Sequence, residues 1–388
     1  MIKSFISYRS FYLGMAIFFL SVKGFNDAYG EVLLPAFINS LKTAATAASL
    51  GLIFLYTFTG VLKKRISSPG IMASIFFVIL TWYNFRGSFY SDEPSNYLYA
   101  FILFAFLLAG FCLDRKSLAK NLSEALLIYS SLYIALSSLI YLFGYGYTEG
   151  SSRFNGLAHH QNANGMFLVI SLFTMIFYLN KFTGSCRILT FLAIIMAILL
   201  ILVTGSRAAI LVSFFGLLLL PRKSIPATLM ALASGAILVS IYFMSNDTAI
   251  SLSVNRMLYA PMDNRNEAWS VLWESFLRQP VVGEGDFAGV SGNIYLSAFA
   301  GTGLVGGAIF LLLSLSALFK AFSIIRKSQK NNFFDAKDLA SSIILAVLVA
   351  GIFEAYTFDR LSPFPYIFCL SLIIIEFCES SKNRVQSA

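Results

Sequence analysis

Residues 188–220 read ILTFLAIIMAILLILVTGSRAAILVSFFGLLLL and decide the fold class. The stretch holds a single charged residue, Arg207, in a short polar break between two apolar runs. An α-helix needs roughly 20 apolar residues to cross a bilayer, and the first run, 188–205, is close to that length. We therefore predict two successive membrane-spanning helices, of which the second, 208–220, is short.

The rest of the chain has the same character. Of its 388 residues, 58% are hydrophobic and 12% are charged, whereas soluble domains carry about 25% charged residues. Charge this sparse cannot cover the surface of a water-soluble globule. The predicted fold class is therefore an all-α, polytopic integral membrane protein, with residues 1–388 forming a single transmembrane domain and the first helix uncleaved.

Hydropathy divides the chain into about twelve predicted spans. A loop over 245–292 separates the ninth span from the tenth and is the longest stretch without a span. The predicted spans are 10–26, 43–62, 69–87, 96–113, 121–145, 162–180, 188–205, 208–220, 226–244, 293–319, 339–357 and 362–379.

The basic residues predict the orientation of these spans. The formal net charge is +9, and with the N-terminus inside, 19 of the 28 Lys and Arg residues fall in predicted cytoplasmic loops and termini. Positive charge marks the cytoplasmic side of membrane proteins, so an even number of spans with both termini cytoplasmic is expected. The charge orients the protein, and we expect no nucleic-acid partner.

Metal and cofactor chemistry is not indicated. Cys112, Cys186, Cys369 and Cys378 have no CxxC spacing, so we expect neither a disulfide nor a metal site. Gly301, Gly303 and Gly306 spell GxGxxG, but they lie inside an apolar span and not after a strand. Close helix packing, with Gly303 and Gly307 as a GxxxG pair, is the expected role of these glycines.

The long outer loop is predicted to contain a surface helix. Asn264 and Glu267 have the spacing of a capping box, and Pro280 and Gly283 end the helical pattern. The pattern fits a helix at the membrane surface and equally a helix packed on the protein's own outer face. Its apolar stripe consists of Ala268, Trp269, Leu272, Trp273, Phe276 and Leu277.

Ionisable residues at membrane boundaries are the candidates for chemistry, because charge there is costly. Arg207 has small neighbours that leave space for a ligand. Arg265 opens the predicted surface helix, where an anion would offset its repulsion by the helix dipole. Arg153 is a third candidate. Proton acceptors are sought among His159, His160 and Glu267, with Glu284 and Asp286 as further carboxylates.

These residues occur in an order that resembles the superfamily of bacterial O-antigen polymerases (Wzy type) and O-antigen ligases. The resemblance covers about 153–307, and each element is short. Its elements are Arg153-Phe154-Asn155-Gly156 leading to Asn162, Thr204-Gly205-Ser206-Arg207-Ala208-Ala209, Arg265 with Trp269 to Pro280 and Gly283-Glu284-Gly285, and Asn293-Ile294-Tyr295-Leu296 followed by Gly303 and Gly306.

The resemblance implies a GT-C-like membrane fold and glycosyl transfer between undecaprenyl-diphosphate-linked oligosaccharides at the periplasmic face of the bacterial inner membrane. The lipid bilayer is the surrounding partner, and a polysaccharide chain-length regulator is a candidate partner. Arg207, Arg265 and Arg153 would bind the diphosphate. His159, His160 and Glu267 would supply the base, and Asn162, Glu284 and Asn293 would bind sugar.

One position separates the two activities of the superfamily. Ligases carry a functional histidine immediately before the asparagine that opens the span after the long loop, and here that position is Gly292. A polymerase is therefore expected ahead of a ligase. A secondary transporter or flippase is the third alternative, for which repeat symmetry and midplane helix breaks would be the signature.

Overall fold

The fold is taken from a computed structural model of the whole chain. It describes residues 6–23, 32–62, 70–91, 115–147, 153–158, 160–218, 264–285, 292–331, 335–354 and 362–385.

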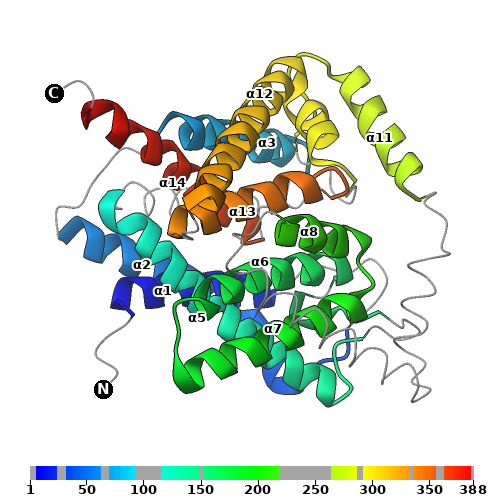
Figure 1. The fold of residues 1–388 in the computed structure, drawn as a ribbon. Coiled ribbons are helices and arrows are strands. Elements are labelled where there is room, and N and C mark those ends of the chain that lie inside the picture. The colour runs from blue at the N-terminus through cyan, green and yellow to red at the C-terminus, as the bar shows by residue number, and fades with distance from the viewer. Residues whose placement is uncertain are drawn as a thin grey trace. The chain divides into compact units, whose positions relative to one another are not determined.

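The all-α prediction is confirmed within these ranges, which hold one isolated β-bridge, between Tyr147 and Phe154. Figure 1 shows the helices in chain order from blue to red. They are α1 (Tyr8–Lys23), α2 (Ala36–Leu62), α3 (Ile71–Ser91), α5 (Arg115–Leu142), the 3-10 helix η1 (Gly156–Ala158), α6 (Gln161–Leu179), α7 (Gly184–Thr204), α8 (Arg207–Leu218), α11 (Asn264–Arg278), α12 (Ile294–Asn331), α13 (Ala336–Ala350) and α14 (Phe364–Val385).

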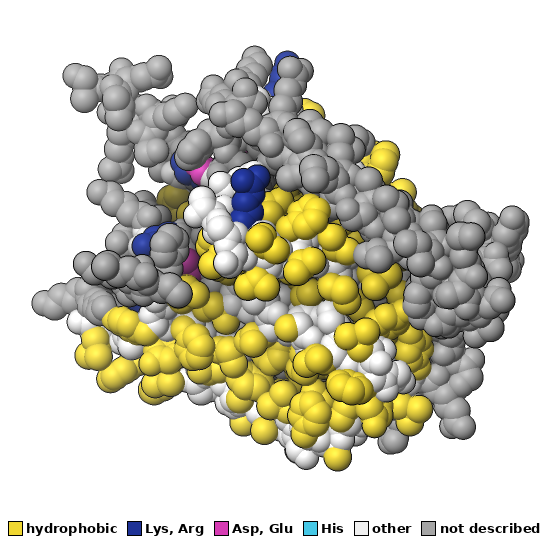
Figure 2. All heavy atoms as spheres, turned by 60° about the horizontal axis from the view of Figure 1, so that its bottom comes forward, with side chains coloured by type: hydrophobic (Ala, Val, Ile, Leu, Met, Phe, Trp, Pro, Cys, Tyr) yellow, Lys and Arg dark blue, Asp and Glu magenta, His cyan; other side chains and the backbone are white. Residues whose placement is uncertain are grey.

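Ten of the twelve predicted spans coincide with described helices, whereas 96–113 and 226–244 lie outside the described residues. Among the described helices, five are long and apolar enough to cross a membrane. Figure 2 shows a broad face covered by hydrophobic side chains, as lipid contact requires. These features are compatible with a membrane-embedded protein, and the twelve-span count stays a prediction.

Several helix ends differ from the predicted spans, and two of these differences have a clear physical cause. α12 continues from the predicted end at 319 to Asn331, because Lys, Arg and Gln beyond the apolar run are good helix formers. α13 ends at Ala350 and not at 357. The reason is a contact with the start of α12, where the Ile294 N–H donates to the Gly351 carbonyl (2.7 Å).

The chain divides into two compact units, which we describe separately. The first consists of Met1–Leu52, Lys120–Ala260 and Ile325–Ser342, and the second of Ile53–Ala119, Pro261–Ile324 and Ile343–Ala388.

In the first unit, α6 is the central helix, and 94% of its span is buried. It packs against α7 and α8, and the three helices lie side by side in Figure 1. Gly165 permits a close approach of α6 and α8, since a Cβ there would lie 2.8 Å from the Cβ of Ala209.

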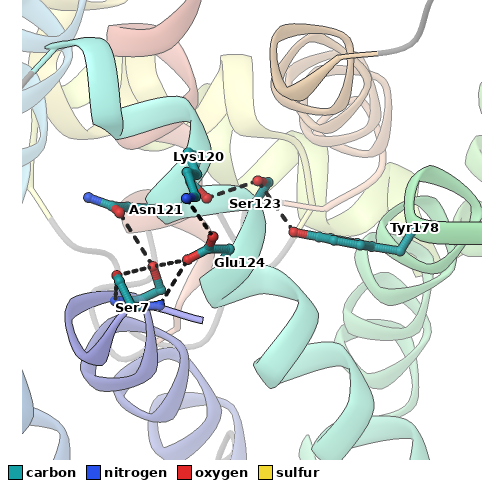
Figure 3. Close-up of polar contacts among 7 residues, drawn as sticks. Ser7, Lys120, Asn121, Ser123, Glu124 and Tyr178 are labelled. Carbon is teal, nitrogen blue, oxygen red and sulfur yellow. Dashed lines mark hydrogen bonds and ion pairs between the residues drawn. The ribbon is translucent and has the colours of Figure 1, made fainter. Parts of the chain in front are cut away.

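A polar cluster joins the starts of α1 and α5 to the end of α6 (Figure 3). The buried carboxylate of Glu124 accepts hydrogen bonds from the Ser7 N–H (3.2 Å) and the Ser10 hydroxyl (2.7 Å). On the other side of α5, the hydroxyls of Ser123 and Tyr178 lie 3.5 Å apart. Glu124 thereby supplies acceptors for donors that the first turn of α1 leaves unsatisfied.

The second unit contains a matching contact between α14 and α3. The carboxylate of Glu376 accepts the N–H groups of Ile71 (2.7 Å) and Met72 (3.0 Å), which open α3. Phe76 packs its ring against Phe368 at a centroid distance of 5.0 Å. Polar capping at the helix end and aromatic packing along the helix together fix α3 on α14.

Helix ends that the charge pattern assigns to one side of the membrane lie together within each unit. The starts of α1 and α5 and the end of α6 are all predicted to be cytoplasmic, as are the start of α3 and the end of α14. The opposite ends meet likewise: the Phe154 N–H donates to the Val203 carbonyl, and the Gly146 N–H to the Leu33 carbonyl. In the first unit these contacts agree with the predicted alternation of spans, which stays a prediction.

α12 is interrupted at Gly303, whose φ of 70° and ψ of −171° are not helical. The loop after α11 fills the break. The Glu284 N–H donates to the Ala300 carbonyl (2.8 Å), and the Leu304 N–H donates to the Pro280 carbonyl (2.7 Å). The predicted GxxxG packing of helix on helix is thus wrong for Gly303, which accommodates a loop because a side chain would collide with the Val281 carbonyl.

Gly303→Ala should destabilise the protein, because the φ/ψ pair at this position is open essentially to glycine alone and costs other residues about 1–3 kcal/mol. The matched control is Gly51→Ala, since Gly51 lies in helix α2 and an added Cβ would meet nothing within 4 Å. We expect a lower thermal unfolding midpoint in detergent for Gly303→Ala and an unchanged or higher one for Gly51→Ala. Equal midpoints for the two variants would contradict the constraint at Gly303.

Candidate functional site

A half-buried arginine holds together the predicted outer ends of α6 and α7. The Arg153 Nε donates to the Thr204 carbonyl (2.9 Å), and its Nη2 donates to the Gly205 carbonyl (3.2 Å) and to Oδ1 of Asn162 (2.8 Å). The last carbonyls of a helix lack intrahelical donors and carry the negative end of its dipole. A guanidinium at this point supplies both hydrogen-bond donors and positive charge.

The sequence Thr204-Gly205-Ser206 builds the turn to which Arg153 binds. Gly205 takes the left-handed conformation (φ 59°) that ends α7, which glycine adopts at no steric cost. The Thr204 hydroxyl donates to the Ile201 carbonyl (2.6 Å) and accepts the Ser206 N–H (3.2 Å). The Ser206 hydroxyl then caps α8 by accepting the Ala209 N–H (3.3 Å).

Arg207 is the first residue of α8 and is half-buried. Its neighbours Ala208 and Ala209 are buried against the unit. A cation in the first turn of a helix is repelled by the helix dipole. An anion bound there is attracted by the dipole and by the guanidinium. The turn thus places a guanidinium and a helix N-terminus at one end of an apolar bundle.

Residues behind the turn are tightly packed. The Tyr133 hydroxyl donates to Oδ1 of Asn164 (2.6 Å), and the Asn164 amide donates to the Phe154 carbonyl (3.5 Å). Gly156 has a φ of 57° and lies directly against the Asn164 side chain, so only glycine fits. Residues 153–156 are therefore held from behind while Arg153 binds the turn.

His160 is the N-cap residue of α6, and its Nδ1 accepts the Ala163 N–H (3.4 Å). A neutral imidazole that accepts through Nδ1 carries its proton on Nε2. In this geometry Nε2 is a donor, and His160 can act as a base only if the cap opens. His159 lies outside the described residues.

Glu284, a predicted sugar ligand, accepts hydrogen bonds from residues of the second unit. Its carboxylate accepts two hydrogen bonds from Arg278 (2.8 and 3.1 Å) and one from the Ser275 hydroxyl (2.6 Å). The hydrogen bond from Arg278 lowers the pKa of Glu284. The carboxylate therefore stays ionised as an acceptor and is a weak base.

A helix, α11, lies where the surface helix of the long loop is predicted; it begins at Asn264 and ends at Arg278, two residues before Pro280. Arg265 is its second residue, and the side chain of Arg265 lies outside the described part. Glu267 is exposed in the first turn. Glu267, one of the three predicted bases, therefore lies on the surface of the second unit.

Asn293 caps α12. Its Oδ1 accepts the N–H groups of Tyr295 (2.9 Å) and Leu296 (3.1 Å), and its Nδ2 donates to the Ile352 carbonyl (2.9 Å). These bonds tie the start of α12 to the end of α13. The geometry therefore gives Asn293 a structural role, whether or not it also contacts sugar.

Arg86 was not among the residues singled out from the sequence. Its Nε and Nη2 both donate to the Gly283 carbonyl (3.3 Å each), and the nearby Trp82 Nε1 donates to the Val282 carbonyl (3.1 Å). The sequence feature that could have identified Arg86 is the position of an arginine at the predicted outer end of the 69–87 span. These two side chains hold the loop that fills the break in α12.

The structure brings Arg153, Asn162 and the turn leading to Arg207 together in the first unit. In the second unit it places Glu267, Glu284 and Asn293 on or beside α11 and α12. No group of three or more His, Cys, Asp or Glu side chains suited to a metal ion occurs among the residues the structure describes.

Comparison with known proteins does not assign the chain to a family. No protein-family model matches it. A search of curated proteins likewise finds no significant match.

Arg153→Ala should lower the thermal unfolding midpoint in detergent, because it removes charge-assisted hydrogen bonds worth about 1.5–3 kcal/mol. Arg153→Lys should recover part of the loss, since one ammonium cannot reproduce the planar fork. Arg187→Ala, at the exposed opposite end of α7, is the matched control and should change little. A midpoint for Arg153→Ala equal to that of the control would refute the clamp.

Proposed function

We propose that the chain is a surface-polysaccharide (O-antigen) polymerase that joins oligosaccharide repeat units carried on undecaprenyl diphosphate at the periplasmic face of the bacterial inner membrane. The observation that carries the proposal is the turn at 204–207, where Arg153 fixes the end of α7 and Arg207 begins α8. An apolar bundle that keeps two arginines and a helix N-terminus at one end suits a lipid-linked diphosphate.

In the proposed reaction, an acceptor hydroxyl attacks the anomeric carbon of the donor sugar and the carbon–oxygen bond to the diphosphate breaks. The leaving group gains negative charge as that bond breaks. Arg207 would stabilise this charge directly, as preorganised donors do in other transferases. Arg153, whose donors hold the turn, would position Arg207.

A base must take the proton from the acceptor hydroxyl. Glu284 is weakened for this role by its ion pair with Arg278, and His160 by its capping bond. His159 therefore leads the candidates of the first unit, and Glu267 leads those of the second.

A ligase that transfers finished polymer to the lipid A core is the second candidate. The position of the ligase histidine is Gly292 here, and a Cβ at Gly292 would lie 3.2 Å from Trp269 and 3.3 Å from Ala268. An added side chain would need these neighbours to move by a few tenths of an ångström. The glycine at the position of the ligase histidine supports the polymerase over the ligase.

A transporter or flippase is the third candidate, since transporters bind substrate at discontinuous helices. The break at Gly303 is such a discontinuity. However, Gly303 lies 17 residues before Lys320, which is about 26 Å of helix and close to the whole hydrocarbon thickness. This spacing supports a break near the outer boundary of the membrane rather than at its midplane.

Deleting the gene in its own host distinguishes these functions by the lipopolysaccharide pattern on a gel. We expect core carrying a single repeat unit, with the ladder of longer chains lost. Bare core with polymer accumulating on the carrier lipid would instead indicate a ligase. Bare core with unjoined units retained inside would indicate a flippase, and an unchanged ladder would overturn all three.

Arg207→Ala should reduce polymer formation about 100-fold or more, the usual cost of removing one charge-stabilising donor. The measurement is restoration of the ladder in the deletion strain, with membrane insertion checked by immunoblot. Arg207→Lys should retain part of the activity, and Arg187→Ala on the neighbouring helix should retain all of it. A normal ladder from Arg207→Ala would refute the assigned role of the arginine.

A further inference from the structure

α11 presents three different surfaces around its circumference. One sector faces the body of the second unit, where Leu272 and Ser275 are buried and Phe276 packs against Phe299 at a centroid distance of 5.8 Å. Trp269 also belongs to this sector, since its Nε1 donates to the Gly292 carbonyl (3.2 Å). The predicted apolar stripe is therefore only partly used for packing.

Two other apolar side chains of the stripe, Trp273 and Leu277, are exposed. Trp273 is 50% and Leu277 57% exposed, and they lie next to each other because i and i+4 share a helix face. The third sector is polar and exposed: Ser270, Glu274 and Arg278 follow on the side away from the packed face. At about 100° per residue, the order around the helix is packed, apolar and exposed, then polar and exposed.

The exposed apolar sector continues beyond α11. Two hydrogen bonds join the segments that carry this sector. The Leu304 N–H donates to the Pro280 carbonyl, and Trp82 Nε1 donates to the Val282 carbonyl. We call this surface the interfacial patch. It consists of Trp82 (40% exposed), Phe85 (49%), Trp273 (50%), Leu277 (57%), Val281 (72%), Leu304 (58%) and Val305 (63%).

The depth of the interfacial patch in the membrane follows from the length of α12 between Leu304 and Lys320. Leu304 lies 16 residues before Lys320, about 24 Å along the helix, and the residues between are apolar apart from small serines. Charged residues resume at Lys320, where the inner boundary is expected. The patch therefore lies near the outer edge of a hydrocarbon layer of about 30 Å, which is the depth that tryptophan prefers.

We propose that α11 lies in the outer membrane–water boundary, with the interfacial patch buried among lipid headgroups and upper acyl chains and the Ser270–Glu274 side in water. The occupant of the patch is bilayer lipid. A helix with a packed, an apolar and a polar sector matches a site where protein, lipid and water meet. The proposal rests on membrane embedding and not on the proposed glycosyl transfer.

Two cysteine variants test the proposal in a background without the four native cysteines. Glu274→Cys and Leu277→Cys probe adjacent exposed positions of one helix, in membranes disrupted so that a charged maleimide reaches both sides. We expect Glu274→Cys to be labelled and Leu277→Cys to be protected. Equal labelling would place the patch in water, and protection of both would place α11 under other protein, either of which overturns the proposal.

If Leu277→Cys alone is protected, tryptophan fluorescence distinguishes protection by lipid from protection by protein. In vesicles of phosphatidylcholine, the double variant Trp82→Phe with Trp269→Phe leaves Trp273 as the reporter. Spin labels near the headgroup should quench Trp273 more strongly than labels deep in the acyl chains. Absence of lipid quenching would mean that protein, such as a second copy of this chain, covers the patch, and would refute the proposal. A reporter that keeps only Trp269 is the packed control.

Discussion

Backbone hydrogen bonding at helix ends is the constraint on which the described structure depends. In hydrocarbon, an unsatisfied N–H or carbonyl has no water to bind, so each interruption of a helix needs a partner from the protein. Here those partners are specific. Arg153 binds the end of α7, Glu124 the start of α1 and Glu376 the start of α3. A chain with few charges uses several of them to complete its helices.

The same constraint explains the two clusters of functional candidates. Arg153 is needed where α7 stops, and the stop at Gly205 is what allows α8 to begin with Arg207. In the second unit, the break at Gly303 requires a loop, and that loop carries Glu284. Polar groups therefore gather at predicted outer helix ends because the backbone there has to be completed, and binding chemistry would be built on that scaffold.

Hydropathy and charge predicted the helices well because both act locally. The positions of ten spans, the polar turn at Arg207 and the extent of α11 all follow from runs of apolar residues and from turn-forming residues such as Pro280. The interactions that sequence patterns did not predict are those between residues far apart in the chain. The capping role of Glu376, the bond of Asn293 to Ile352, the bonds of Arg86 to Gly283 and the loop in the Gly303 break join segments that no local pattern connects. The capping by His160 reduces its suitability as a base, which residue type alone did not indicate.

The carboxylate contact between α3 and α14 has a consequence for how the protein is made. Ile71 and Glu376 are 305 residues apart, so α3 emerges from the ribosome long before the group that completes its first turn. α1 waits in the same way for Glu124, 117 residues after Ser7. Early helices must therefore enter the bilayer with provisional ends, and the second unit reaches its final arrangement only after synthesis of the last helix.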